Sequence, residues 1–277
     1  MANRWRYGVV VLLAAAHVLG LAAAAVAASN RVTVINNCVQ TLWITALSNA
    51  GEPALQPADR LVQIASGKSH PYAIPDGHWG GQFRPKFGCD ASGNNCSSGQ
   101  SLPPCPAGGC QPPAESKIEF YFPTADANPP LPFFDVSLVD GFTLKARITP
   151  SVAASGNCTP FTCNLTFDDC PSNEAFGLGN LKVMAGGQPV MCLSPCKKWS
   201  YPAPYGLGNP ETQGIGRELC CAGGISARDC NAGRVVQTQY VQTLRQKCPS
   251  SYSFAYDDQG GTHACPLTTN FTVTFCP

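Results

Sequence analysis

The sequence predicts a mainly β protein that is cross-linked by disulfides. Short segments of alternating apolar and polar residues, rich in β-branched and aromatic side chains, are typical of half-buried strands. Sixteen cysteines follow an apolar N-terminal segment, which indicates a disulfide framework. The 27 glycines and 25 prolines among 277 residues indicate many turns between short elements. A chain of this length also buries a core of its own, so the disulfides add to packing.

Residues 1–28 are expected to be a signal peptide. Arg4 and Arg6 precede an apolar run over residues 8–26, and the run ends in the small-x-small pattern Ala25-Val26-Ala27. Basic, apolar and small-residue regions in this order are typical of an export signal with a cleavage site. The mature chain is therefore expected to be secreted, and in an oxidising compartment its even number of cysteines forms eight disulfides.

Three strands are predicted near the ends of the mature chain. Residues 31–35 and 41–46 lie on either side of Cys38 and are rich in β-branched residues. Residues 271–275 alternate between apolar and polar side chains just before Cys276. Alternation with a period of two means that one face of the strand is buried and the other is wet.

The clearest local prediction is a hairpin between residues 133 and 149. Residues 136–139 are expected to pair with residues 142–148 across Asp140-Gly141, a favoured pair for a two-residue type I′ turn. Apolar residues alternate along the second arm, which favours one buried face. These apolar residues are Phe142, Leu144, Ala146 and Ile148.

Two segments interrupt the strand pattern. Residues 89–117 contain four cysteines and five prolines, so a small disulfide-held flap is predicted there. Residues 158–248 are rich in cysteine and loops, with one predicted helix over residues 235–246. The apolar residues of that helix recur at helical spacing at Val236, Tyr240, Val241 and Leu244.

Composition also bears on partners and cofactors. The formal net charge is +1, or −1 without Arg4 and Arg6, so there is no electrostatic reason to bind nucleic acid or anionic membranes. No apolar stretch after the leader approaches about 18 residues, so no stable membrane insertion is expected. The histidines outside the leader lie in no metal or nucleophile motif, and no zinc spacing is present, so neither a metal nor a cofactor is expected.

Four motifs resemble those of the thaumatin-like proteins, a family of plant pathogenesis-related proteins of the osmotin and zeamatin type. Residues 132–142 read Pro-Phe-Phe-Asp-Val-Ser-Leu-Val-Asp-Gly-Phe, which resembles the central motif of the family. Residues 218–221 (Glu-Leu-Cys-Cys), 248–258 and 270–277 resemble its later motifs, and the sixteen cysteines occur in matching order. The resemblance covers the whole mature chain.

The resemblance implies a flattened β-sandwich core with a small disulfide flap and a loop-rich, partly helical disulfide lobe. The core comprises residues 29–88, 118–157 and 249–277, the flap residues 89–117 and the lobe residues 158–248. A cleft lies between the sandwich and the lobe. The implied disulfides are Cys38–Cys276, Cys89–Cys96, Cys105–Cys110, Cys158–Cys265, Cys163–Cys248, Cys170–Cys192, Cys196–Cys220 and Cys221–Cys230.

Members of this family often line the cleft with four carboxylates and one arginine. The motifs place Glu119, Asp135, Asp140 and Asp257 at the four acidic positions. At the arginine position the chain reads Gln82-Phe83-Arg84, so Gln82 replaces the arginine unless Arg84 substitutes for it. The flap motif of the family is also altered, over residues 98–105.

Such carboxylates have more than one interpretation. Two carboxyl groups across a scissile bond hydrolyse glycosides, but carboxylates also only hydrogen-bond sugar hydroxyls. Asp140 lies in a predicted turn, where aspartate is favoured for backbone reasons, and Asp257 is also consistent with a turn residue. Apolar neighbours make a structural role harder to argue for Asp135 and Glu119. Four tyrosines are candidates for stacking on sugars or for packing: Tyr201, Tyr205, Tyr252 and Tyr256.

The function implied by the resemblance is that of a secreted, apoplastic, antifungal defence protein. As a monomer, it would bind β-1,3-glucan or a similar fungal wall polysaccharide in the acidic cleft. One alternative is a weak endo-β-1,3-glucanase with Glu119 as acid and Asp135 as nucleophile or base, and another is an inhibitor of a secreted foreign enzyme. Glycosylation is expected at Asn164 and Asn270, because the sequons at Asn95 and Asn157 contain a cysteine next to a disulfide.

Overall fold

The computed structural model describes residues 28–99, 114–152, 156–258 and 261–277. The predicted signal peptide therefore lies outside the described residues except for Ala28, which begins the first strand. The predicted Cys105–Cys110 disulfide also lies outside them. The mainly β prediction is confirmed, because most of the described elements are strands gathered into three sheets.

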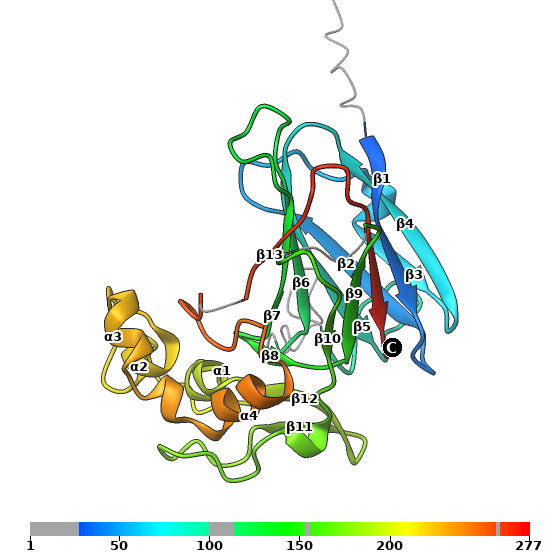
Figure 1. Cartoon of the computed structure of the whole chain (residues 1–277). Coiled ribbons are helices and arrows are strands. Elements are labelled where there is room, and N and C mark those ends of the chain that lie inside the picture. Colours follow the sequence, from blue (N-terminus) through cyan, green and yellow to red (C-terminus); the bar gives the residue numbers. More distant parts are fainter. Residues whose placement is uncertain (1–27, 100–113, 153–155, 259–260) are drawn as a thin grey trace, which may run out of the picture.

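Two sheets form the sandwich seen in Figure 1. The five-stranded sheet contains, in spatial order, β10 (Phe161–Cys163), β9 (Ala146–Pro150), β14 (Phe271–Phe275), β1 (Ala28–Asn36) and β4 (Lys68–Pro75). The six-stranded sheet contains β13 (His263–Ala264), β7 (Phe133–Ser137), β6 (Lys117–Phe122), β5 (Trp79–Phe87), β2 (Leu42–Ser48) and β3 (Leu61–Ile64). Neighbouring strands are antiparallel except β1 and β14, which are parallel.

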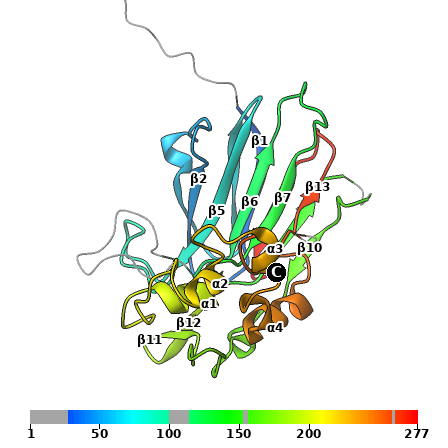
Figure 2. The same ribbon diagram turned by 90° about the vertical axis from the view of Figure 1, so that its left-hand side faces the viewer.

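The core lies between the two sheets and is rich in aromatic rings. Phe120 of β6 packs against Phe271 of β14 with ring centroids 5.2 Å apart. Tyr72 of β4 packs against Phe83 of β5 at 4.7 Å. Alternate side chains along each strand enter this layer, as the period of two requires. The remaining side chains of the six-stranded sheet therefore form an outer face, which Figure 2 presents to the viewer.

The disulfide-rich lobe lies at one end of that outer face (Figure 2). Its strands β11 (Lys182–Ala185) and β12 (Gln188–Leu193) join β8 (Gly141–Phe142) in a three-stranded sheet. Its helices are α1 (Pro195–Ser200), α2 (Gly216–Cys220), α3 (Ala227–Asn231) and α4 (Gln239–Lys247), with short 3₁₀ turns η2 (Phe167–Asp169) and η3 (Val235–Gln237). A further 3₁₀ turn, η1 (Pro57–Asp59), precedes β3 in the sandwich.

The predicted hairpin between residues 133 and 149 is wrong. Strand β7 pairs with β6 and β13, β8 pairs with β12, and β9 pairs with β14 and β10. The Asp140-Gly141 turn therefore carries the chain out of the six-stranded sheet and does not join two paired arms. Gly141 is required there, because its φ is +134° and a Cβ would lie 2.2 Å from the carbonyl oxygen of Cys192.

Two domain boundaries also differ from the prediction. Strand β10 falls within the predicted lobe, residues 158–248, but it pairs with β9 in the sandwich. Strand β8 falls within the predicted core but pairs with β12 of the lobe. Both strands are only two or three residues long. Periodicity carries little information over so short a length, so the sequence pattern did not distinguish them.

The predicted helix over residues 235–246 forms in two parts. Residues 235–237 form η3, and α4 begins after Thr238. The Thr238 hydroxyl accepts a hydrogen bond from the Val241 backbone N–H at 3.3 Å, which caps α4. Tyr240, Val241 and Leu244 are buried, as their spacing indicates. Helices α1, α2 and α3 were not predicted, because five or six residues hold less than two turns of apolar pattern.

Seven of the eight implied disulfides are present in the described residues. The bond between Cys38 and Cys276 joins residues 238 apart in sequence, and it ties the end of β1 to the end of β14. Cys220 and Cys221 bridge in different directions, to Cys196 and Cys230. Short helices of the lobe are therefore held by covalent bonds. No helix in the described part of the chain has the length and apolarity that crossing a bilayer requires.

Candidate functional site

The outer face of the six-stranded sheet carries three polar residues side by side. Gln82 of β5 lies opposite Glu119 of β6, and Glu119 lies opposite Asp135 of β7. Directly opposed residues of antiparallel strands have Cβ atoms about 5 Å apart. All three side chains are partly exposed, because the apolar neighbours in each strand point to the core. The structure thus brings together two carboxyl groups that are sixteen positions apart in sequence.

Asp135 and Glu119 form a pair of facing carboxyl groups. Burial, followed by the negative charge of Glu119, raises the pKa of Asp135 to about 8, while Lys117 partly opposes the increase. The Oδ1 atom of Asp135 is buried and accepts no hydrogen bond from the described residues. Burial and the facing acid therefore both favour the neutral form of Asp135.

Arg84 lies on the same face as this pair. It is two residues along β5 from Gln82, and its Nε donates a hydrogen bond to Gln82 Oε1 at 2.9 Å. A terminal nitrogen of Arg84 also lies 3.2 Å from Glu115 Oε2, and Glu115 is buried. The guanidinium is therefore fixed beside the carboxyl pair, and Gln82 is one of the groups that fix it.

Asp140 connects the sheet to the lobe through two lysines. Lys117 Nζ lies 2.7 Å from Asp140 Oδ2, and Lys197 Nζ of α1 lies 3.5 Å from Asp140 Oδ1. Lys197 also lies 3.7 Å from Glu211. Sequence reasoning missed both lysines, although Lys117 is two residues before Glu119 and so shares its face of β6. The positive charges make this part of the site less acidic than four carboxylates alone.

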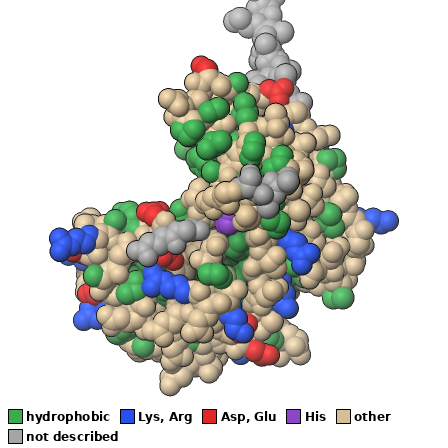
Figure 3. All heavy atoms as spheres, viewed as in Figure 1, with side chains coloured by type: hydrophobic (Ala, Val, Ile, Leu, Met, Phe, Trp, Pro, Cys, Tyr) green, Lys and Arg blue, Asp and Glu red, His purple; other side chains and the backbone are tan. Residues whose placement is uncertain are grey.

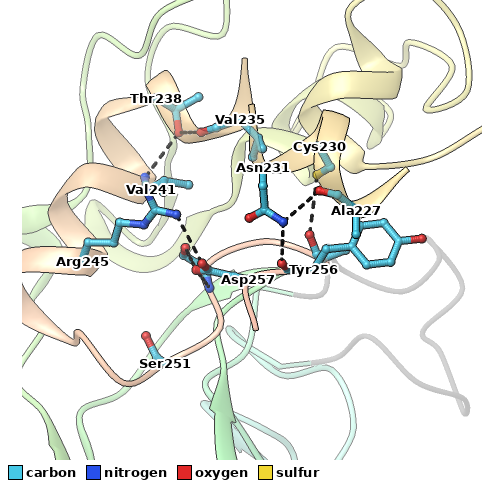
Figure 4. Close-up of polar contacts among 12 residues, drawn as sticks. Ala227, Cys230, Asn231, Val235, Thr238, Val241, Arg245, Ser251, Tyr256 and Asp257 are labelled. Carbon is cyan, nitrogen blue, oxygen red and sulfur yellow. Dashed lines mark hydrogen bonds and ion pairs between the residues drawn. The ribbon is translucent and has the colours of Figure 1, made fainter. Parts of the chain in front are cut away.

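Asp257 is held by its own loop and by α4. Figure 4 shows its carboxylate facing Arg245, whose guanidinium lies 3.3 Å away. The other oxygen of Asp257 accepts hydrogen bonds from the backbone N–H and the hydroxyl of Ser253. The side chain is buried. Asp257 thus stabilises the loop that it belongs to, and its carboxylate has three partners within the protein.

Two tyrosines lie near the acidic groups. Burial raises the pKa of Tyr252, with a contribution from the charge of Asp135, and its hydroxyl lies 2.9 Å from Thr262 Oγ1. Burial also raises the pKa of Tyr201, with contributions from Glu115 and Asp140. These two phenols therefore lie within electrostatic range of the site.

A hollow separates the sandwich from the lobe in the space-filling view of Figure 3. The outer face of the six-stranded sheet, seen in Figure 2, borders it. At the base of the lobe a pocket of about 110 Å³ is lined by polar groups that include Asp140, Lys197, Glu211 and Ser253. We call this region, together with Gln82, Arg84, Lys117, Glu119 and Asp135, the cleft.

Among the described residues one group of candidate metal ligands comes together, and it does not suit a metal. It consists of Cys196, Cys220 and Glu211. Cys196 and Cys220 are joined in a disulfide, so neither sulfur is a thiolate. His263, a histidine that the sequence left unassigned, is stacked on Phe134 with ring centroids 4.8 Å apart.

A comparison with known protein families matches most of the chain. The family model described as "Thaumatin family" matches residues 36–277. This chain belongs to the thaumatin family. The match extends from the end of β1 to the last residue, so it includes the lobe, every other strand of the sandwich and every residue of the cleft.

Curated relatives in the thaumatin family match along most of their length. A protein of Prunus avium named glucan endo-1,3-beta-glucosidase is 32% identical over 251 residues, which cover 87% of this chain and 88% of the relative. Pathogenesis-related protein 5 of Arabidopsis thaliana is 32% identical over 249 residues, which cover 88% and 89%. The fold is also similar to that of a β-1,3-glucanase domain from Clostridium beijerinckii, with a TM-score of 0.50 and 13% identity over 89% of this chain and 98% of that one.

Strand β5 supplies two polar side chains to the cleft. Gln82 and Arg84 lie two positions apart on it, and a hydrogen bond joins them. A single strand positions both side chains, since residues two apart share a face. The guanidinium and the glutamine amide together place hydrogen-bond donors next to Glu119.

Proposed function

We propose that this protein is a secreted plant defence protein that binds β-1,3-glucan or a similar wall polysaccharide in the cleft. Relatives that carry defence and glucan-related names support this proposal. The signal-like segment at residues 1–28 and the disulfides support secretion to the apoplast, because structural disulfides persist in oxidising compartments.

The observation that carries the proposal is the pair of facing acids, Asp135 and Glu119, on the same sheet face as Arg84. A protonated carboxyl donates a hydrogen bond, a carboxylate accepts one, and a guanidinium donates several. The pair lies on a partly exposed sheet face. Sugar hydroxyl groups both donate and accept, so this face offers complementary partners to adjacent hydroxyls of one sugar unit.

Binding requires no fixed separation between the two carboxyl groups, whereas hydrolysis does. Glycosidases place their two carboxyl groups about 5 to 5.5 Å apart for a covalent intermediate, or about 6.5 to 9.5 Å apart to admit a water. Glu119 and Asp135 lie directly opposite each other on neighbouring strands, which is sufficient for hydrogen bonding to one sugar unit.

A pull-down on insoluble β-1,3-glucan tests the proposal. We expect Glu119→Gln and Asp135→Asn to retain less than about a tenth of the wild-type bound fraction, because each removes one carboxyl group of the pair. Asp168→Asn is the matched control, since Asp168 is an exposed acid of the lobe that forms no ion pair with another described residue. Equal retention of all four proteins would remove the cleft from the explanation.

Weak endo-β-1,3-glucanase activity is the second candidate. The raised pKa of Asp135 favours it, because a carboxyl group protonated near neutral pH can act as a general acid. This assigns the acid role to Asp135, whereas the sequence suggested Glu119. Release of oligosaccharides from soluble β-1,3-glucan is the measurement. Release no faster than from the Asp135→Asn variant contradicts this candidate.

Inhibition of a foreign enzyme through the flap is a third possibility from the sequence. Residues 100–113 of the flap lie outside the described residues. The contacts of the cleft add nothing in its favour.

A further inference from the structure

The outer face of the six-stranded sheet is organised in three rows that run across the strands. The acidic row is Gln82, Glu119 and Asp135. Two residues further along the strands on one side lies the basic row, which contains Arg84 and Lys117. On the other side lies a third row, formed by Gly80, Tyr121, Phe133 and Ala264, which we call the aromatic row.

The aromatic row presents two rings between two small residues. The rings of Tyr121 and Phe133 are nearly parallel, with an interplanar angle of 19° and centroids 4.8 Å apart. A Cβ at position 80 would lie 3.3 Å from the Tyr121 ring, so glycine there leaves room for the ring over β5. Phe133 is 37% exposed, which is unusual for phenylalanine.

A second set of contacts fixes the orientation of Tyr121. Its hydroxyl lies 3.0 Å from His78 Nε2, and His78 Nδ1 lies 2.8 Å from Glu52 Oε2. The His78 ring also packs edge-on against the Tyr121 ring, with centroids 5.2 Å apart. Because Tyr121 is held in this way, its ring is preorganised and loses little freedom when a ligand covers it.

We infer that the aromatic row is a second sugar-binding subsite of the cleft. Phe133, the exposed ring of the row, packs against the flat apolar face of a pyranose ring with Tyr121 stacked behind it, while an adjacent unit of the same chain hydrogen-bonds the Glu119–Asp135 pair. This inference rests on the proposed function. Two residues along a strand span about 7 Å, so the aromatic row lies about one sugar unit away from the carboxyl pair.

The size of the aromatic row favours a sugar over a protein partner. A stable protein interface covers about 800 Å² on each side and includes some 20 residues. Two rings flanked by a glycine and an alanine offer far less apolar area than that. A ring face that lies beside hydrogen-bonding groups matches the amphipathic surface of a sugar, which has apolar faces and polar edges.

Calorimetric titration with a β-1,3-linked glucose hexasaccharide tests the subsite. We expect Phe133→Ala to weaken binding about tenfold, because the apolar face of the bound sugar is then exposed to water. Phe133→Trp retains a flat ring and is expected to bind at least as tightly as wild type. Met184→Ala is the matched control, since Met184 is an exposed apolar residue of the lobe strand β11.

The outcomes separate this inference from the proposed function. Wild-type affinity in Phe133→Ala, together with lost affinity in Glu119→Gln, overturns the aromatic subsite and leaves the cleft as a sugar site. No binding by the wild-type protein rejects both. Loss of binding in Phe133→Ala that Phe133→Trp does not restore also overturns stacking, and thermal melting of each variant shows whether it is folded.

Discussion

Asp135 shows how a single residue acquires its chemistry from the strand that carries it. Phe134 and Val136 point into the core, so the side chain between them points outward and meets Glu119. Partial burial and the neighbouring charge then raise its pKa to about 8. The sequence indicated that this acid was difficult to explain as a structural residue. It did not indicate that the pKa of Asp135 is raised.

The raised pKa of Asp135 predicts a dependence of stability on pH. Between about pH 4 and pH 8 the folded protein keeps a proton on Asp135 that the unfolded chain has lost, so stability falls as the pH rises through this window. Asp135→Asn removes this loss, and we expect it to raise the free energy of unfolding by about 4 kcal/mol at pH 7 relative to its effect at pH 4. Denaturant unfolding of both proteins at pH 4, 6 and 8 measures the difference. Parallel curves would contradict the prediction.

The side-chain amides of the four sequons predict which of them carry glycans. Asn157 Nδ2 donates to the Thr262 carbonyl and Asn95 Nδ2 donates to Asp90, so a glycan on either breaks a hydrogen bond. Asn164 and Asn270 are exposed, and neither amide bonds to another described residue. After expression in a secretory plant or yeast host, we expect glycopeptides at Asn164 and Asn270 and unmodified peptides at the other two. Mass spectrometry of the proteolytic peptides measures which of the four sequons carry a glycan.

At the scale of elements, α4 and the 3₁₀ turn before it depend on Thr238. Its buried hydroxyl donates to the Val235 carbonyl at 2.6 Å and accepts from the Val241 N–H. One side chain therefore ends η3 and begins α4. The 3.6-residue spacing of apolar residues predicted a single continuous helix, because spacing alone does not reveal that a capping residue divides the segment.

Thr238→Ala removes this cap and leaves the Val241 N–H without its partner. We expect a loss of about 1 to 2 kcal/mol of unfolding free energy. Gln242→Ala, at an exposed position of the same helix, is expected to change it by less than about 0.5 kcal/mol. Equal effects of the two substitutions in urea titrations would show that the cap does not stabilise α4.

Strands were easier to predict than their partners. Residues 31–35, 42–46 and 271–275 lie in strands, with Thr41 just before β2, because alternation reports a buried face wherever the partner lies. The hairpin prediction was wrong for the same reason. Residues 146–150 do alternate, because one face of β9 packs on the core. Nothing in their sequence indicates that β9 pairs with β14 and β10 in the sheet. Lys117 and Arg84 likewise lie beside the acidic residues because of the register between strands, and this register cannot be read from the sequence.

At the scale of the whole molecule, the Cys38–Cys276 disulfide closes most of the chain into one loop. Cross-links that close long loops reduce the entropy of the unfolded chain the most, by about 5 kcal/mol for this loop in the chain-entropy model against about 2 to 3 kcal/mol for the Cys89–Cys96 loop. The family resemblance implied both bonds.

Replacing each pair by serine tests the contribution of loop length. We expect Cys38→Ser with Cys276→Ser to lower the unfolding free energy by more than Cys89→Ser with Cys96→Ser does, by about 2 kcal/mol. Denaturant titration of the two double variants is the measurement. A smaller loss from opening the long loop would show that the pairing of β1 with β14 already supplies the constraint.

Strand β14 occupies the middle of the five-stranded sheet, between β9 and β1. Without it, β1 with β4 and β9 with β10 are two separate fragments whose apolar faces lack a common neighbour. A deletion of residues 271–277 would therefore deprive the sheet of its central strand and Cys38 of its disulfide partner, so we expect it to prevent the two fragments from joining into one sheet.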